Sequence, residues 1–180
     1  MIAGILLADG ELMSDGEPLA LMRSDADETL LEWQIEQLQQ AGVEVVEVVL
    51  GFEAERFIPL CSGNDVEPIV NERWAEDAAS SLRVGATATP RHTTTAVIVW
   101  LYAPRETAVI KAVLDQHLAA RATVSRPVAG ETPGSPVCID AAVLARVRNI
   151  GDGVDVQDVL RDYDTLVVRV GGEMPDLRSS

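Results

Sequence analysis

The sequence predicts an α/β fold in which helices cover both faces of a mostly parallel sheet. Apolar runs of strand length alternate with segments of helical periodicity along almost the whole chain. Several strand segments, such as 45–50, are continuous and β-branched, which is typical of parallel strands buried on both faces. The first apolar run leads into a turn that contains glycine, as occurs where a backbone approaches a ligand closely.

The elements of the first half follow from these signals in order. The run at 2–8 predicts the first strand, and a loop is expected from 9 to about 27. Asp27 or Thr29 then caps a helix through Gln40, in which Leu and Ile recur at near-helical spacing. The same signals predict a strand at 45–50, a short helix at 53–60, a strand at 66–70, a loop at 71–77 and a helix at 78–88.

The second half continues the alternation with shorter elements. We expect a polar connection at 90–95, a strand at 96–101, a helix at 106–120, a strand at 122–128, a turn-rich loop at 130–136, an extended segment at 136–139, a helix at 141–148, a turn at 151–153, a helix at 156–162 and a strand at 166–170. The tail, 171–180, is expected to be frayed. No repeat, low-complexity tract or linker interrupts the sequence, so we expect one domain over residues 1–180.

The composition is that of a globular protein with an acidic surface. Hydrophobic residues make up 47% of the 180 residues, charged residues make up 24%, and the formal net charge is −15. This charge argues against nucleic acid and anionic membranes as partners, because both favour a basic surface. No apolar run approaches the ~20 residues of a membrane span. The N-terminus lacks the basic segment of a signal peptide, so we expect a cytoplasmic protein.

The loop after the first strand has the shape of a phosphate-binding loop but the opposite charge. Ala8, Gly10 and Gly16 are small enough to let a phosphate approach the backbone. In its first part, 9–22, the charged residues are Asp9, Glu11, Asp15 and Glu17. Because like charges repel, such a loop disfavours a triphosphate that no metal ion compensates.

Five short motifs occur in a recognisable order. They are Leu7-Ala8-Asp9-Gly10, the stretch from Leu30 to Gly51, the stretch from Asn71 to Gly85 with its Trp74 and Ser80-Ser81-Leu82, Pro133-Gly134-Ser135-Pro136, and Gly151-Asp152-Gly153. Together, over roughly residues 2–165, they resemble the MobA/MocA-like nucleotidyltransferases, which attach GMP or CMP to molybdopterin. The resemblance implies a Rossmann-like, three-layer α/β/α nucleotidyltransferase fold with a mostly parallel sheet.

The same resemblance implies candidate nucleotide-binding residues, and it shows where the chain departs from the family. The candidates are Ala8, Gly10, Gly16, Asn71, Ser81 and Arg83. The departures fall on the family's charged and catalytic positions. Counted from Gly10, the family's loop Arg falls at Ser14 and its Lys at Leu19, the metal-binding Asp at Tyr102, and the His of its P-G-H-P motif at Ser135.

Three functions stay open at this point. In the first, the protein has lost nucleotidyl transfer and needs no cofactor; it acts as a binding or interaction module, paired with an active relative or with itself. In the second, it is a weak or altered nucleotidyltransferase in which Asp9 or Asp15 binds Mg²⁺. In the third, the pocket serves another reaction on a small uncharged or cationic ligand.

Two further side chains have alternative interpretations. Arg83 either reaches a phosphate or lies on the surface of its helix. His117 is expected on an exposed helix, without a catalytic partner.

Overall fold

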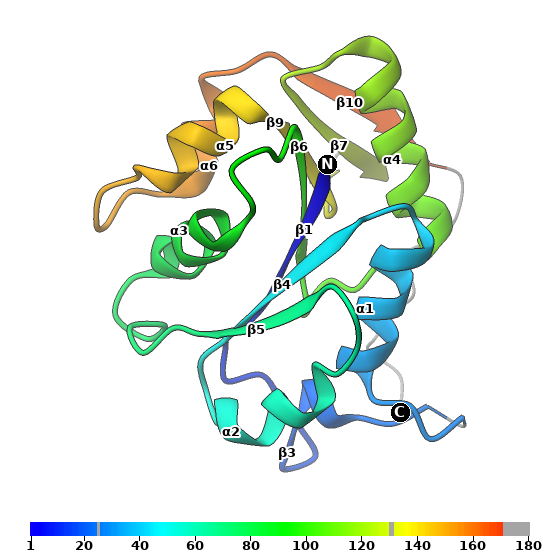
Figure 1. Ribbon diagram of the computed structural model, residues 1–180, viewed down its shortest axis with the longest axis vertical. Coiled ribbons are helices and arrows are strands. Elements are labelled where there is room, and N and C mark those ends of the chain that lie inside the picture. Colours follow the sequence, from blue (N-terminus) through cyan, green and yellow to red (C-terminus); the bar gives the residue numbers. More distant parts are fainter. Residues whose placement is uncertain (25, 130–131, 171–180) are drawn as a thin grey trace.

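The computed structural model describes residues 1–24, 26–129 and 132–170, which form a central sheet between two layers of helices (Figure 1). Seven strands follow the order β10-β7-β9-β6-β1-β4-β5, and β8 pairs with β7. Their bounds are β1 (Ile2–Ala8), β4 (Val45–Leu50), β5 (Val66–Val70), β6 (Thr95–Trp100), β7 (Val124–Ala129), β8 (Thr132–Pro133), β9 (Val137–Asp140) and β10 (Thr165–Arg169). The pairings of β8 and β9 are antiparallel, and the remaining pairings in this sheet are parallel.

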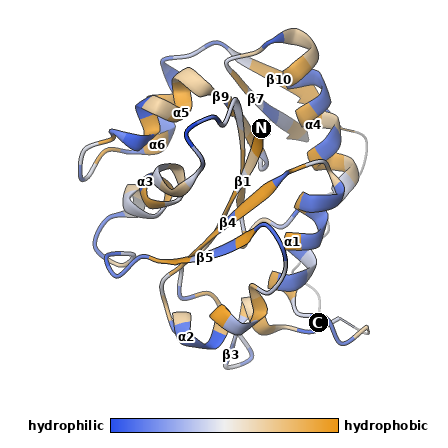
Figure 2. Cartoon of the chain, viewed as in Figure 1, coloured by the Kyte–Doolittle hydropathy of each residue, from blue (hydrophilic) through white to orange (hydrophobic). Residues whose placement is uncertain are grey.

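The helices divide between the two faces of the sheet. One face is covered by α1 (Leu30–Gln40) and α4 (Thr107–Ala120), and the other by α3 (Ala78–Ala88), α5 (Ala141–Arg148) and α6 (Val156–Arg161). The short α2 (Ala54–Phe57) follows β4. Hydrophobic residues dominate the central strands, whereas the helices carry hydrophobic and hydrophilic residues together (Figure 2).

The alternation of side chains along β1 separates two cores. Leu6 belongs to the core under α1 and α4, and Ile5 to the core under α3 and α5. The second core requires a glycine, because a Cβ on Gly85 of α3 would lie 2.6 Å from Ile5 Cγ2 and 2.9 Å from Val49 Cγ2. The missing side chain therefore lets α3 lie directly on β1 and β4, and this places the start of α3 beside the carboxyl end of β1.

The fold class and most predicted elements are confirmed. The segments 45–50, 66–70, 78–88 and 141–148 form the predicted strands and helices with the predicted bounds. Of the two possible caps of α1, Thr29 is the one used: its side chain and that of Glu32 form a reciprocal capping box. The predicted frayed tail, 171–180, lies outside the described residues.

The loop predicted from 9 to 27 is wrong in part, because it contains a hairpin. Strands β2 (Met13–Ser14) and β3 (Glu17–Pro18) pair in antiparallel fashion, and a 3₁₀ turn at Leu19–Leu21 follows. The two residues between the strands, Asp15 and Gly16, have φ of 50° and 83°. Positive φ at both central positions defines the tight type I′ hairpin turn, which an Asp-Gly pair favours.

His117 is buried, which corrects the prediction of an exposed position. It is 2% exposed and lies on the buried face of α4, where its Nδ1 is 2.8 Å from Ser125 Oγ on β7. Burial lowers the pKa of His117, and the Asp140 carboxylate opposes this shift in part. The ring is therefore neutral in the folded protein near pH 7 and ties the helix to the sheet.

This burial predicts a loss of stability in mild acid. Below the ordinary histidine pKa of ~6.5 the unfolded chain binds a proton on His117 that the folded chain excludes, so stability is complete above that pH and falls as the pH decreases. Urea unfolding at about pH 7.5 and pH 5.5, either side of that value, should show a smaller loss for His117→Gln than for the wild type, by at most ~1.4 kcal/mol per pH unit. The matched control is His92→Gln, at an exposed position; an equal loss in all three proteins would contradict the prediction.

Candidate functional site

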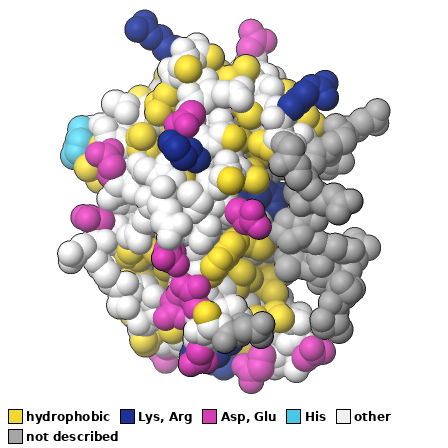
Figure 3. Space-filling model, turned by 90° about the vertical axis from the view of Figure 1, so that its right-hand side faces the viewer, with side chains coloured by type: hydrophobic (Ala, Val, Ile, Leu, Met, Phe, Trp, Pro, Cys, Tyr) yellow, Lys and Arg dark blue, Asp and Glu magenta, His cyan; other side chains and the backbone are white. Residues whose placement is uncertain are grey.

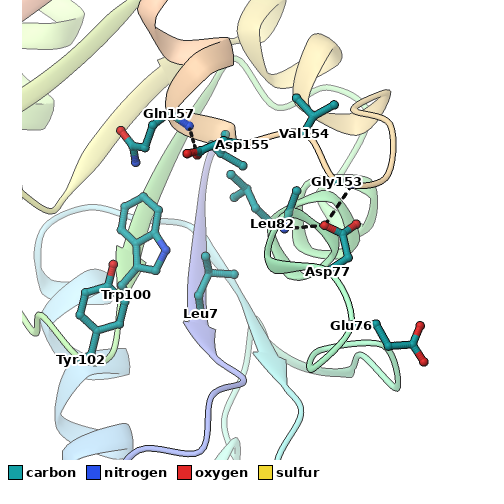
Figure 4. A pocket seen from close by; sticks show the side chains of 12 residues that line it. Leu7, Glu76, Asp77, Leu82, Trp100, Tyr102, Gly153, Val154, Asp155 and Gln157 are labelled. Atoms are coloured by element: carbon teal, nitrogen blue, oxygen red, sulfur yellow. Dashed lines mark hydrogen bonds between the residues drawn. The ribbon is translucent and has the colours of Figure 1, made fainter.

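A cleft of about 440 Å³ lies at the carboxyl-terminal edge of the sheet (Figure 4). The ends of β1 and β6, the start of α3 and the segment that leads into α6 form its walls. Its lining residues are Leu7, Glu76, Asp77, Ala79, Leu82, Trp100, Tyr102, Gly153, Val154, Asp155, Val156 and Gln157. In an open parallel sheet, this edge is the usual place for a ligand.

The lining of this cleft is apolar, aromatic and acidic. Trp100 and Tyr102 lie together on one side, and Asp77 lies on the other (Figure 4). Asp155 and Glu76 add two more carboxyl groups, and no Lys or Arg is among the lining residues. A bound anion would therefore meet carboxylates and aromatic rings, without a cation on the cleft wall.

The carboxylates of the cleft also hold its walls in place. Asp77 caps α3, because its Oδ1 accepts a hydrogen bond from Ala79 N at 3.1 Å, and it also accepts one from Gly153 N at 3.4 Å. Asp155 caps α6 by accepting a hydrogen bond from Gln157 N at 2.8 Å. An acidic N-cap satisfies helix amide groups that would otherwise lack a partner. These side chains thus stabilise the backbone around the cleft as well as setting its charge.

Arg83, a candidate phosphate ligand, instead joins two walls of the cleft. Its Nη2 lies 3.3 Å from Asp77 Oδ2 and 2.8 Å from Asp152 Oδ1, and its Nη1 donates to Ile150 O at 2.7 Å. Its side chain is 19% exposed, so it lies half-buried between these two walls. Arg73 also pairs with Asp152, and Arg73 first and then Arg83 lower the pKa of that carboxyl. Both arginines near the cleft are therefore engaged by carboxylates.

Two other candidates, Asn71 and Ser81, belong to a buried hydrogen-bonded chain. Asn71 Nδ2 donates to Ser80 Oγ and to Ser81 Oγ, each at 2.8 Å, and Asn71 Oδ1 accepts from Arg73 N at 3.1 Å. Ser81 in turn donates to the Asp9 carboxylate. The structure thus brings Asn71, Ser81 and Asp9 together. Their hydrogen bonds connect the loop after β5 and the start of α3 to the loop after β1.

The loop after β1 packs tightly against the end of β4. Asp9 O accepts a hydrogen bond from Phe52 N at 2.9 Å. A Cβ on Gly51 would lie 2.6 Å from that oxygen and 2.4 Å from Trp74 Cγ, so only glycine fits there. Trp74 meets Phe52 edge to face with ring centroids 5.9 Å apart, so it packs this loop against the end of β4. Of the candidate residues at the start of this loop, Ala8 is buried and Gly10 is exposed.

Of the four positions at which the family's charged groups are replaced, only Tyr102 lines the cleft. It is 57% exposed, and burial of its ring together with the Asp9 carboxylate raises the pKa of the phenol. Ser14 and Leu19 line a different groove, between the 3₁₀ turn and the start of α1. Ser135 is buried, and its carbonyl accepts a hydrogen bond from Arg105 Nε at 2.6 Å. Gly16 lies in the hairpin turn.

The described side chains form no preformed cage for a divalent cation. Over residues 1–24, 26–129 and 132–170, no three His, Cys, Asp or Glu side chains are arranged to hold a metal ion. The Asp9 carboxylate takes the Ser81 hydrogen bond, and Asp15 is exposed in the hairpin turn. A phenol that stays protonated near pH 7 cannot replace a carboxylate as a ligand of Mg²⁺.

Sequence reasoning missed the residues that come from the segment before α6 and from the first turn of α6. Val154, Asp155 and Gln157 form one wall of the cleft. The aspartate before this helix predicts a cap, but the approach of this segment to β1 depends on the whole fold.

In the described part of the chain, no helix is long and apolar enough to cross a membrane.

Comparisons with known proteins agree with this architecture. The family model described as MobA-like NTP transferase domain matches residues 4–166. Rv0371c from Mycobacterium tuberculosis H37Rv has a similar structure, with a TM-score of 0.81 and 20% identity over 97% of this chain and 90% of that one. A second structure of Rv0371c, titled as a complex with manganese, has a TM-score of 0.79 and 20% identity over 99% and 93% of the two chains.

Two further structures extend the likeness. A nucleotidyl transferase from Methanothermobacter thermautotroptrophicus, Mth528, has a TM-score of 0.77 and 21% identity over 96% of this chain and 88% of that one. Molybdopterin-guanine dinucleotide biosynthesis protein A from Archaeoglobus fulgidus has a TM-score of 0.63 and 14% identity over 93% and 83%. No curated protein shows significant similarity. At these identities the structural likeness shows the fold.

The contacts of Arg83 predict that this side chain stabilises the walls of the cleft and is not available to bind a phosphate. Arg83→Met keeps the aliphatic stem but leaves Asp77, which is buried, without its cation. We expect a loss of about 1–3 kcal/mol in the free energy of unfolding, measured with urea and without ligand. Arg91→Met, at an exposed position, is the control. An unchanged stability for Arg83→Met would mean that the arginine has no structural role and is free for a ligand.

Proposed function

Because the chain belongs to the family of MobA-like NTP transferase domains, we propose that it is a member that binds a ligand or a partner protein without transferring nucleotides. One observation carries this proposal: the cleft at the carboxyl edge of the sheet is lined by three carboxyl groups and by no basic residue. Nucleotidyl transfer moves a phosphoryl group between anionic reactants, so its catalysis depends on cations that stabilise the transition state.

The magnitude of the electrostatic effect supports the proposal. Two unit charges 4 Å apart interact by ~1 kcal/mol in water and ~4 kcal/mol near a protein surface. Replacing an attractive charge pair by a repulsive one changes the binding free energy by about twice the energy of one pair. Even modest changes of this kind at several positions therefore weaken triphosphate binding by orders of magnitude. The arginines nearest the cleft, Arg73 and Arg83, are paired with carboxylates and offer little compensation.

A second candidate function is the binding of a small uncharged or cationic molecule in the same cleft. The observation that favours it is the combination of an apolar floor, Leu7 and Leu82, with two aromatic side chains and acidic walls. Such a lining suits an apolar or cationic ligand better than a phosphate. A search for co-purified ligands by native mass spectrometry distinguishes this function from an interaction module.

The remaining alternative is a weak, metal-dependent nucleotidyltransferase. The manganese complex of Rv0371c motivates a test of Mn²⁺ as well as Mg²⁺. In this alternative, the Asp9 carboxylate would have to exchange its Ser81 hydrogen bond for a metal ion. No arrangement of the described side chains favours that exchange.

The proposal predicts no response to nucleotides. The thermal unfolding temperature should be the same with and without CTP or GTP at millimolar concentration with Mg²⁺ or Mn²⁺, because a ligand at 100 times its dissociation constant would stabilise the protein by ~2.7 kcal/mol. Pyrophosphate release with molybdopterin as acceptor should stay at the level of a blank. A MobA-like enzyme that retains the basic loop serves as the positive control. A clear increase in the thermal unfolding temperature with either nucleotide would contradict the proposal.

The positions of the replaced residues predict that restoring charge alone is insufficient. Leu19→Lys combined with Tyr102→Asp restores two family residue types, but Leu19 lines another groove than the cleft. We therefore expect the double variant to show no stabilisation by GTP with Mg²⁺ in the same thermal assay. Stabilisation of the double variant, but not of either single variant, would show that charge was the only loss and that the loop geometry is intact.

A further inference from the structure

A second groove, of about 370 Å³, lies between the 3₁₀ turn at Leu19–Leu21, the start of α1 and the segment before α4. Its apolar lining consists of Leu19, Met22, Leu30, Trp33 and Pro104. Its polar lining consists of Ser14, Arg23, Ser24, Glu28 and Glu106. None of these residues lines the first cleft, so the groove is a separate site.

The surface around this groove exposes large hydrophobic side chains. Met22, on the groove wall, is 44% exposed, and Leu12 and Met13 on the adjoining hairpin are 37% and 48% exposed. On the face of the molecule that Figure 3 shows, hydrophobic side chains are spread over the surface, and several Asp and Glu side chains lie among them in the lower half. Contiguous exposed apolar surface with a polar rim is typical of interaction sites, and methionine adapts its shape to a partner.

The walls of the groove are fixed by backbone hydrogen bonds. Leu30 N donates to Met22 O at 2.8 Å, and Ser24 N donates to Glu28 O at 2.9 Å. Leu19 N donates to Leu12 O at 2.7 Å, which holds the hairpin against the 3₁₀ turn. The groove therefore exists before any partner binds, which reduces the conformational entropy lost on binding.

The charge at the rim is negative. Burial, the carboxylates of Glu36 and Glu32, and a hydrogen bond shared with Glu36 all raise the pKa of Glu28. Arg23, the one basic residue of the lining, pairs with Asp27 at 3.2 Å. A cation placed beside Glu28 would relieve the repulsion among these carboxylates. Two copies of a chain with a net charge of −15 repel each other, which disfavours a second copy as the occupant.

We propose that this groove binds an amphipathic, basic segment of a partner protein. Apolar side chains of the segment pack on Leu19, Met22 and Trp33, and its Lys or Arg side chains meet Glu28 and Glu106. This inference rests on the proposed function as an interaction module, and it names the chemistry of the partner. The positions that carry Arg and Lys in the family, Ser14 and Leu19, then line a surface for protein binding.

Isothermal titration calorimetry with synthetic peptides tests this inference. The probe is a helical peptide with Leu on one face and Lys on the other; its counterpart carries Glu in place of each Lys. We expect the full-length protein to bind the basic peptide and not the acidic one. Met22→Gln should weaken binding about tenfold, the effect of losing an apolar contact of ~1.4 kcal/mol, whereas Leu118→Gln, at an equally exposed position on α4, should leave it unchanged.

A second pair of variants tests the role of charge. Glu28→Gln and Glu72→Gln remove the same charge, but only Glu28 lines the groove. We expect Glu28→Gln alone to weaken binding of the basic peptide. Equal effects of the two variants would mean that only the net charge attracts the peptide, and they would overturn the inference, as would a lack of binding by the wild type.

A third pair of titrations tests whether the protein's own residues 171–180, which lie outside the described structure, occupy the groove. A full-length variant with Met174→Asp and Leu177→Asp should bind the basic peptide as the wild type does. Binding at least about tenfold tighter, a gain of ~1.4 kcal/mol, would assign the groove to the chain's own tail and overturn the inference. Because these titrations contain no nucleotide, a negative result leaves the proposed loss of nucleotidyl transfer standing, and nucleotide binding would contradict only that proposal.

Discussion

The cleft at the carboxyl edge of the sheet depends on the ion pairs that Arg83 makes with Asp77 and Asp152. The arginine joins the start of α3 to the turn before α6, and Asp77 at the same time caps α3 and accepts a hydrogen bond from Gly153. This arrangement sets the shape of the cleft. It also engages a cation that could otherwise meet a phosphate, so the contacts that stabilise the site also determine its charge.

The scaffold and the chemistry of this protein are controlled by different residues. Buried apolar side chains such as Ile5, Leu6 and Val49 stabilise the sheet by packing in its two cores. Because Gly85 lacks a side chain, α3 can lie directly on the sheet. The packing of these apolar residues does not depend on the charge of the loop after β1. A domain of this family can therefore replace the residues that bind triphosphate and keep its fold, because fold and function are separable.

The predictability of each feature from the sequence reflects the range of the interactions behind it. Strands such as β4 were predicted because a continuous β-branched run is a local signal. The hairpin at Asp15 and Gly16 was missed although its turn signal is also local, because an acidic, polar loop lacks the apolar alternation of a strand. The burial of His117, the wall formed by Asp155 and the separate groove at Leu19 depend on packing between distant segments, which no local pattern encodes.

The central claim is that the cleft has no affinity for a nucleoside triphosphate, and nuclear magnetic resonance tests it most directly. In ¹⁵N-labelled protein, the indole N–H of Trp100 and the backbone N–H of Gly153 report on two walls of the cleft. Titration with GTP and Mg²⁺, and separately with CTP and Mg²⁺, should leave both signals in place. A saturable shift of these signals, at concentrations that leave the indole signal of Trp33 in the second groove unchanged, would contradict the claim.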